Sequence, residues 1–536
     1  MRVRGSFSEP RFGRQFLDSP WRGIIPCLLT LCLSAVLTGG CCGLPKLEHR
    51  TASSALSPAA AKNTRLGQAL APLLKTNPGK TGVFPLADAH DAFATRMLLA
   101  QVAERTLDIQ YYIWRGDMTG TLLFEALHVA ADRGVRVRLL LDDNNTSRID
   151  ATLAALNSHP NIEIRLFNPF RYRGLRLFDF LTDFPRVNRR MHNKSFTADN
   201  QVTIVGGRNI GDEYFGAIDS LVFADLDVIA MGPVVRELSS EFDRYWASSS
   251  SWPAERILAP AKPARIEELA AAATRTERDP AAAAYMEALR QAPFIRQMLS
   301  GELNPEWAVT RMVSDDPAKV LGRAKPERMI IHQLREAIGE PTTEVELVSP
   351  YFVPTAAGVK ALSAMSRRGV KIQVLTNSLN ATDVAPVHAG YAKRRKALLK
   401  AGVRLFELRR KSPKSRGDKR VGPFGSSGSS LHAKTFSVDR SRVFIGSFNF
   451  DPRSAQLNTE LGFVIESPTL AQEIEAAFND FIPQNAYEVK LSDQGRLYWM
   501  ERRGKKTIRH DREPGATFWK RTGIKLLSWL PIEWLL

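Results

Sequence analysis

"MHNKSFTAD" at 191–199 and "LHAKTFSVD" at 431–439 share one pattern: a histidine, a lysine two residues later and an aspartate five residues beyond the lysine. At average composition a given histidine is followed by such a lysine and aspartate about once in four hundred cases. The chain has only 9 histidines. Two chance occurrences are therefore a poor explanation.

The match between the two stretches continues downstream. "GGRN" begins at 206 and "GSFN" begins at 446, which is the same distance after each histidine. Asn209 and Asn449 consequently occupy equivalent positions. We infer that the chain contains an internal duplication.

The duplication also extends upstream, where runs of β-branched and aromatic residues alternate with helical stretches. Strands that alternate with helices predict α/β units on a largely parallel sheet. The predicted strands are 107–114, 135–143 and 161–168 in the first copy and 345–354, 370–378 and 402–408 in the second, with helices over 121–134 and 356–369.

The doubling has a chemical rationale. Exchange of a phosphodiester through a covalent intermediate needs one group that attacks phosphorus and one acid that protonates the leaving oxygen. One motif supplies one histidine, so two motifs facing each other across a pseudo-twofold would supply both. The lysines and asparagines would then stabilise the charge that develops on the non-bridging oxygens. These side chains are Lys194, Lys434, Asn209 and Asn449.

Two copies of H-x-K-x4-D followed by G-[GS]-x-N resemble the signature of the phospholipase D superfamily over about residues 85–490. "LDIQYYIW", "MHNKSF", "VGGRNIGDEYF" and "LHAKTF" are most similar to bacterial cardiolipin synthases, especially the branch called cardiolipin synthase C. The resemblance implies two tandem α/β/α sandwich units with the active site at their interface. It also implies a phosphatidyltransferase without a cofactor, which forms cardiolipin through a phosphatidyl-histidine. The implied acceptor is phosphatidylglycerol, and the donor is phosphatidylethanolamine or a second phosphatidylglycerol.

The resemblance implies a role for each motif residue. His192 is the expected nucleophile and His432 the general acid and later base, although the symmetry of the sequence does not distinguish them. The motif aspartates are expected to stabilise the fold around the site. The full candidate catalytic set is His192, Lys194, Asp199, His432, Lys434 and Asp439.

Other polar residues complete the candidate site. A catalytic histidine needs an acceptor for its second ring nitrogen, commonly a carboxylate. The second copy offers Glu460, 28 residues after His432, and the first offers Asp225, 33 residues after His192, with Asp227 as an alternative. The candidate phosphate-binding residues are Asn209, Asn449, Gly207 and Ser447, although the glycines are equally well explained as turn residues. Strand packing is the favoured interpretation of Tyr111, Tyr112 and Trp114.

The composition favours an anionic partner. The 536 residues carry a formal net charge of +18, which suits an anionic membrane surface or a nucleic acid. With 44% hydrophobic residues the chain can bury two domains' worth of core. No group of cysteines and histidines stands at metal-ligand spacing, so the sequence predicts catalysis without a metal. Basic stretches precede each motif, at 170–178, 186–194, 392–400 and 408–420.

The two ends of the chain favour a membrane. Five arginines precede the apolar run 24–40, and the positive-inside rule would place the body on the far, periplasmic side of a bacterial membrane. "VLTGGCC" resembles a lipoprotein cleavage site with Cys41 as the lipidated residue, but Thr38 stands where leucine is usual, so an uncleaved anchor is an alternative. All 4 cysteines lie at or before residue 42, so the body contains no disulfide. The segment 517–536 has the tryptophans and lysines of a bilayer-interface segment, with a tail packed on the domain as the alternative.

These observations predict a domain order and leave two other functions open. A phospholipase D that releases phosphatidic acid would use the same motifs, and a nuclease or nucleic-acid-binding protein would suit the charge. We find no nucleic-acid motif. The sequence does not show whether an accessory protein is needed. The predicted order is a signal peptide or anchor (1–42), a linker (43–84), the first phospholipase D-like domain (85–250), a helical connection (251–340), the second domain (341–490) and a membrane-interface tail (491–536).

Overall fold

The computed structural model places residues 47–536 in one compact unit, separate from residues 1–46. The predicted N-terminal anchor and the lipidation site at Cys41 lie outside the described residues, as does most of the basic stretch 408–420. The residues described are 43–48, 50–146, 148–217, 223–261, 265–290, 296–297, 302–410 and 430–536.

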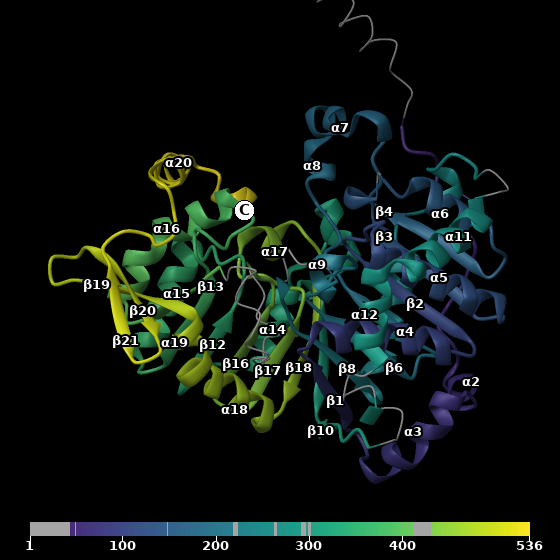
Figure 1. Cartoon of the computed structure of the whole chain (residues 1–536), viewed down its shortest axis with the longest axis horizontal. Helices are drawn as coiled ribbons and strands as arrows, with labels where there is room; N and C mark the ends of the chain where they lie inside the picture. Colours follow the sequence, from purple (N-terminus) through teal and green to yellow (C-terminus); the bar gives the residue numbers. More distant parts are fainter. Residues whose placement is uncertain are drawn as a thin grey trace, which may run out of the picture. The chain divides into compact units, whose positions relative to one another are not determined.

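The first half of the chain builds a sheet of nine strands (Figure 1). All residues of β2, β5, β6 and β8 are buried, so side chains on both faces of the sheet are covered. In spatial order the strands are β10 (Glu306–Ala308), β1 (Thr81–Leu86), β8 (Asp227–Met231), β6 (Val202–Gly206), β5 (Ser195–Ala198), β2 (Thr106–Tyr111), β3 (Arg136–Asp142), β4 (Ile162–Phe167) and β9 (Ser251–Pro253).

The second half repeats this arrangement in a sheet of ten strands. Eight successive strands of the second sheet match β1, β8, β6, β5, β2, β3, β4 and β9 of the first in order, which confirms two tandem α/β units. The strands are β11 (Thr310–Ser314), β18 (Leu461–Glu466), β17 (Arg442–Gly446), β16 (Thr435–Val438), β12 (Glu344–Val348), β13 (Lys371–Asn377), β14 (Arg404–Leu408), β19 (Ala486–Leu491), β20 (Leu497–Arg503) and β21 (Lys506–His510).

The prediction of a largely parallel sheet is wrong. Within each large sheet only β2–β3–β4 and β12–β13–β14 are parallel, and the other described pairs are antiparallel. Parallel neighbours require crossover connections. These connections contain the helices α5 (Met118–Asp132), α6 (Asp150–Leu156), α15 (Thr355–Arg367) and α16 (Ala385–Lys400). β5–β6 and β16–β17 are instead joined by tight turns whose residues Asp199, Asn200, Asp439 and Arg440 have φ near 50°. The strand–helix–strand segments follow the predicted pattern, whereas these hairpins are additional to it.

Helices cover the sheets, and the segment between the units is more than a helical connection. It also supplies β10 and β11, which are neighbours in the chain but join different sheets. The helices are α2 (Pro58–Lys62), α3 (Arg65–Thr76), α4 (Ala89–Val102), α5 (Met118–Asp132), α6 (Asp150–Leu156), α7 (Arg176–Thr182), α8 (Phe184–Val187), α9 (Asp212–Phe215), α10 (Pro233–Trp246), α11 (Arg265–Arg278), α12 (Pro280–Arg290), α14 (Ile330–Ile338), α15 (Thr355–Arg367), α16 (Ala385–Lys400), α17 (Pro452–Gln456), α18 (Pro468–Ala476), α19 (Ile482–Asn485) and α20 (Phe518–Trp529).

The two units share a hydrophobic core. One cluster of buried residues combines Val205 and Val228 of the first sheet with Ile445 and Phe463 of the second. Removing this apolar surface from water stabilises the association of the units. Two short strands, β7 (Phe223–Ala224) and β15 (Ser430–Leu431), also pair across the boundary. The boundary is therefore a fixed surface on which a site can be built.

Among the helices of the described residues, none is both long enough and apolar enough to cross a membrane.

Candidate active site

Both motif histidines lie at the boundary between the units. His192 precedes β5 and His432 precedes β16, and only 8% and 7% of their surfaces are exposed. The backbone N–H of His192 donates to the carbonyl of Thr459 over 2.9 Å, and that of His432 donates to the carbonyl of Ala224 over 2.7 Å. Each histidine is thus held by the backbone of the other unit. Such reciprocal contacts are typical of an approximate twofold axis.

The carboxylates that hold the histidines are also exchanged between the units. Nδ1 of His192 lies 2.9 Å from Oε2 of Glu460, and Nδ1 of His432 lies 2.5 Å from Oδ2 of Asp225. The prediction that each histidine is held by a carboxylate of its own copy is wrong. The reason is the cross-boundary backbone pairing, which places each histidine beside the carboxylate-bearing segment of the other unit.

Asp227, the alternative to Asp225, serves a different purpose. Its carboxylate accepts from Arg96 over 2.8 Å and from the backbone N–H of Arg208 over 3.2 Å. All three residues are buried. Asp227 therefore neutralises a buried arginine instead of holding a histidine.

The electrostatic surroundings of the two histidines differ. Burial, followed by the charges of Lys194 and Lys434, lowers the pKa of His192 well below its usual value. Burial and Lys434 also lower the pKa of His432, but Asp225 opposes them. His192 is consequently neutral at physiological pH, with Nδ1–H donating to the carboxylate and Nε2 left as the basic atom.

The pKa values of the two carboxylates are shifted in opposite directions. Burial raises the pKa of Glu460 to about 7, although Lys194 opposes it. Burial would also raise the pKa of Asp225, but its ion pair and hydrogen bond with His432 bring the pKa below the usual range. Asp225 therefore keeps its negative charge beside His432, whereas Glu460 titrates near neutral pH.

The motif lysines are buried beside the histidines. Nζ of Lys194 donates to the backbone oxygen of His192, and Nζ of Lys434 lies 3.2 Å from Nδ1 of His432. Burial lowers the pKa of Lys194 to about 7, with Lys434 acting in the same direction and Glu460 against it. Each lysine also lowers the pKa of both histidines. The charges of each motif therefore act on the histidines of both motifs.

The candidate phosphate-binding residues make several internal contacts. Oδ1 of Asn209 accepts from Ile113 N–H over 3.1 Å, and its Nδ2 donates to the Tyr214 hydroxyl. Oδ1 of Asn449 is buried and has no hydrogen-bond partner among the described residues. The asparagines follow β6 and β17 and flank the site, and their contact with phosphate stays a prediction.

Ser447 and Gly207 contact the carboxylates. The hydroxyl of Ser447 donates to Glu460 and accepts from Leu461 N–H over 3.0 Å. A Cβ at Gly207 would lie 2.2 Å from Oδ1 of Asp225, so only glycine lets that carboxylate approach. Ser447 and Gly207 occupy equivalent positions in the two copies. Ser447 hydrogen-bonds to Glu460, and Gly207 leaves room for Asp225. Phosphate binding by either residue stays a prediction.

The motif aspartates are anchors for the backbone. Oδ1 of Asp199 accepts from Arg105 N–H and Thr106 N–H over 2.7 and 2.9 Å, and Oδ2 accepts from Glu104 N–H over 3.0 Å. Asp439 accepts from the N–H groups of residues 342–344 in the same way. Each aspartate fixes the start of the central strand, β2 or β12, at the end of the sheet away from the histidines.

Replacing Asp199 by alanine is expected to lower the free energy of unfolding by about 3 kcal/mol or more, because three backbone N–H groups lose their acceptor. Asp199→Asn keeps one acceptor oxygen and is expected to cost less. Urea denaturation of both variants measures the difference. Equal stability of the alanine variant and the parent would show that these hydrogen bonds do not stabilise the fold.

Aromatic rings surround the histidines. The ring of Tyr112 meets His192 edge-on at 5.0 Å between centroids, whereas Tyr214 and Phe223 lie 5.2 and 5.1 Å from His432. Strand packing was the interpretation favoured for Tyr112, and that interpretation is wrong because β2 ends at Tyr111 and the next residue turns toward the site. Tyr111 and Trp114 do lie in the core. Tyr214 could have been recognised by its place in "GGRNIGDEY", five residues after Asn209.

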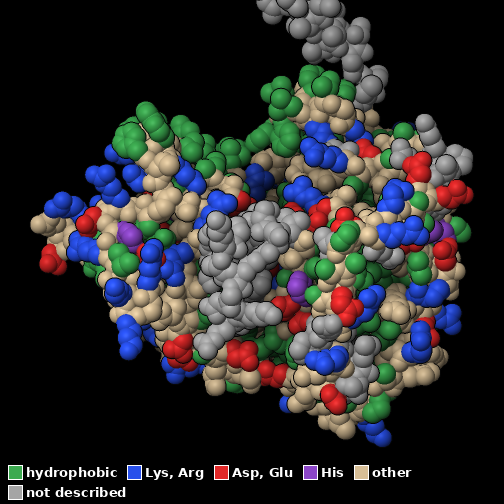
Figure 2. All heavy atoms as spheres, viewed as in Figure 1, with side chains coloured by type: hydrophobic (Ala, Val, Ile, Leu, Met, Phe, Trp, Pro, Cys, Tyr) green, Lys and Arg blue, Asp and Glu red, His purple; other side chains and the backbone are tan. Residues whose placement is uncertain are grey.

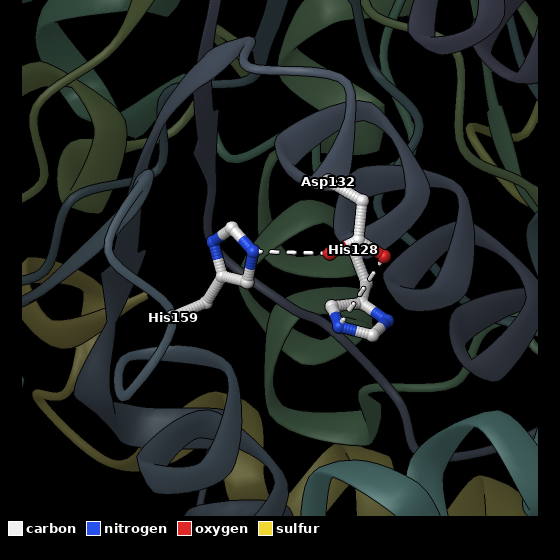
Figure 3. Close-up of side chains that lie close together, drawn as sticks. All are labelled: His128, Asp132 and His159. Atoms are coloured by element: carbon white, nitrogen blue, oxygen red, sulfur yellow. Dashed lines mark hydrogen bonds and ion pairs between the residues drawn. The ribbon is translucent and has the colours of Figure 1, made fainter.

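One group of potential metal ligands lies elsewhere in the first unit (Figure 3). It contains His128 and Asp132 of α5 and His159, which precedes β4. The backbone N–H of Asn161 donates to Nδ1 of His159 over 3.1 Å, and Nε2 of His159 lies 3.2 Å from Oδ1 of Asp132. Both ring nitrogens of His159 therefore already have partners in the protein. The contacts explain this group without an ion.

The chain is similar to proteins of known families. Residues 98–246 and 334–482 each match the family model described as "Cardiolipin synthase, PLD-like domain". Cardiolipin synthase C of Escherichia coli K12 is 52% identical over 472 residues, which cover 88% of this chain and 100% of the relative. An uncharacterised protein of Helicobacter pylori strain 26695 is 32% identical, covering 79% of this chain and 83% of its own length. The structure of phosphatidylserine synthase from Haemophilus influenzae aligns with a TM-score of 0.50 at 13% identity, over 80% of this chain and 91% of that one, and indicates the same fold.

Proposed function

The chain belongs to the phospholipase D-like family of cardiolipin synthases, and from this premise we propose that it joins two phospholipids into cardiolipin through a phosphatidyl group held on His192. The chain is a phospholipase D-type phosphatidyltransferase, as its relationship to cardiolipin synthase C indicates. The observation that carries the proposal is the pair of buried histidines, each held by a carboxylate of the other unit.

The first half of the reaction forms the covalent intermediate. Nε2 of His192 attacks phosphorus, the bond from phosphorus to the headgroup oxygen breaks, and His432 gives its proton to that oxygen. The headgroup alcohol leaves, and the phosphatidyl group stays on His192. In the second half, His432 takes the proton of a lipid hydroxyl, whose oxygen attacks phosphorus and releases His192.

The difference between the two histidines supports this division of roles. A nucleophilic imidazole must be neutral, and the surroundings of His192 strongly favour the neutral form. A general acid must hold a proton before it gives one away, and the negative charge of Asp225 limits the lowering of the His432 pKa that burial and Lys434 cause. The lysines and asparagines would bind the non-bridging oxygens, where preorganised donors act most strongly in the transition state.

The proposed substrates are phosphatidylglycerol as acceptor and phosphatidylethanolamine or phosphatidylglycerol as donor. An anionic membrane surface is the proposed location, with the net charge of +18 in support. We further propose that the N-terminal segment anchors the chain, either by itself or through lipidation of Cys41, with the body on the periplasmic side. The segment 517–536 is proposed to lie at the bilayer interface.

Purified enzyme in vesicles that contain phosphatidylglycerol is expected to produce more cardiolipin than phosphatidic acid. The reacting histidines are almost fully buried among aromatic rings, which limits the access of water to the intermediate. Mass analysis of the extracted lipids measures the ratio of the two products, which should fall as an inert lipid dilutes the acceptor. Phosphatidic acid as the main product at every acceptor density would favour a hydrolase.

A further inference from the structure

The segment around α7 presents apolar side chains to solvent and turns two of its arginines inward. Leu175, Leu177 and Leu181 are 73%, 74% and 77% exposed. Arg173 and Arg176 of the same segment are only 15% exposed. This is the reverse of the usual distribution on a protein surface, where long charged side chains face water.

The inward arginines are neutralised, and they fasten the segment to the first sheet. Arg173 pairs with Asp143 at the end of β3 and with Asp150 of α6. Nη1 of Arg176 donates to the backbone oxygens of Asp143 and Asn144. Of the three arginines in the basic stretch 170–178, two are therefore turned inward, whereas Arg171 is 36% exposed and pairs with Asp183. The segment is a fixed projection whose most exposed side chains are leucines.

A second set of exposed apolar residues lies on the same edge of the molecule. In Figure 2 the hydrophobic side chains gather along the edge that carries α7 and α20 in Figure 1. Ile524 of α20 is buried against Leu379 and Ala389, which fixes the helix on the second unit. The opposite side of the helix leaves Trp519 and Trp529 79% and 70% exposed.

Arg453 links the end of the chain, which follows α20, to the segment that follows α7 and α8. Its backbone N–H and Nε donate to the backbone oxygens of Leu536 and Leu535, over 2.7 and 3.0 Å. Its guanidinium also donates to the backbone and side-chain oxygens of Asn188, the residue after α8, over 2.9 and 2.7 Å. Because Asn188 is four residues before His192, the apolar edge is attached directly to the catalytic boundary.

We propose that α7 and α20 together form one bilayer-docking rim, with α7 entering the apolar layer and α20 lying at the interface. Three observations favour a lipid surface as the occupant. The apolar sets come from both units and lie along one edge of the molecule, the tryptophans are typical of the interface region, and 517–530 contains Lys520, Arg521 and Lys525 without an acidic residue. The proposal rests on the proposed function insofar as a bilayer delivers the substrates.

The rim is tested by placing an environment-sensitive fluorophore on Leu177→Cys in the full chain with Cys27, Cys32, Cys41 and Cys42 replaced by serine. Vesicles of phosphatidylglycerol and phosphatidylcholine are expected to shift its emission to the blue, and brominated lipids to quench it. The matched control is the same label on Leu73→Cys, since Leu73 is exposed on α3 at the opposite edge of Figure 1 and should not respond.

The outcomes separate the rim from the catalytic proposal. No response at 177 on vesicles whose lipids are turned over would overturn the rim and leave the function intact. A response at 177 without any turnover would support the rim and count against the function. A blue shift that needs no vesicles and grows with protein concentration would identify a second copy of the chain as the occupant and overturn the bilayer.

An activity measurement provides an independent test. A triple variant is expected to reduce turnover on vesicles about tenfold or more, because the binding energy from moving three leucine side chains out of water into the bilayer is lost. It combines Leu175→Ser, Leu177→Ser and Leu181→Ser. Turnover of a short-chain phospholipid dissolved as monomers should not change. Leu73→Ser combined with Ile331→Ser, two exposed residues elsewhere, is the control. Equal losses on both substrates, or no loss on vesicles, would contradict the proposal.

Discussion

Replacing His192 by alanine is expected to reduce turnover by at least about 10⁴-fold, as removal of a nucleophile or its base does in other covalent mechanisms. The same loss is expected for His432→Ala, since neither histidine can attack phosphorus and protonate the leaving oxygen at once. Both side chains are nearly buried at one boundary. Among the described residues no other imidazole has the same contacts, so none replaces either histidine. Initial rates on phosphatidylglycerol vesicles measure the effect.

His332→Ala is the matched control. This histidine is exposed on α14, where its ring lies 3.6 Å from Glu336, outside the site. Its loss is expected to leave turnover unchanged. Full activity of His432→Ala would exclude the mechanism with two histidines.

Rapid quenching distinguishes the roles of the two histidines. With labelled donor lipid, the phosphatidyl group is expected on His192, the imidazole whose surroundings most strongly favour the neutral form. Quenching with a denaturing detergent at neutral or basic pH, which preserves the acid-labile bond between phosphorus and imidazole, and peptide mapping in the same pH range locate the label. Label on His432 and never on His192 would reverse the assignment while preserving the two-histidine site.

The local pattern of the sequence was sufficient to predict the repeated unit. The strands β2, β3 and β4 and their counterparts β12, β13 and β14 begin within two residues of the predicted runs, because buried parallel strands are continuous apolar segments. However, β2 and β12 end three and six residues earlier than predicted. The hairpins after them were missed. Their turns are formed by Asp199 and Asp439 with positive φ, and in the sequence these residues were interpreted only as members of the motif.

The sequence predicts which residues belong to the site, but it does not predict which of them contact one another. A pattern in one copy identifies His192 and Asp225 as functional candidates, yet nothing in the spacing shows that the carboxylate will contact His432. That contact depends on β7 pairing with β15 across the boundary, an arrangement of two segments about 200 residues apart. The inward orientation of the arginines in the α7 segment could not be predicted for the same reason, since their partner Asp143 belongs to another element.

Asp225→Asn is expected to reduce turnover by about 10³- to 10⁴-fold, the loss that an amide causes when it replaces a histidine-orienting carboxylate in a catalytic triad. The amide has nearly the same shape, so the close contact with Gly207 is preserved. It removes the negative charge that opposes burial and Lys434 at His432, and the pKa of His432 should fall further. Because the first step needs protonated His432, the decline of activity with rising pH should begin at a lower pH in the variant.

A structural role alone would not produce this pH shift, and the double variant separates the two explanations. If Asp225 acts through His432, adding Asp225→Asn to His432→Ala should cause no further loss of turnover, because the group on which the carboxylate acts is already absent.

Glu460→Gln provides the contrast. Glu460 contacts His192, whose low pKa arises mainly from burial and the lysines, so the high-pH limb of the activity profile should keep its position. Pre-steady-state and steady-state pH profiles of the single variants, with unfolding curves to establish that each is folded, measure these effects. A high-pH limb that is unmoved in Asp225→Asn, or a further large loss in the double variant, would show that Asp225 does not act by supporting the proton on His432.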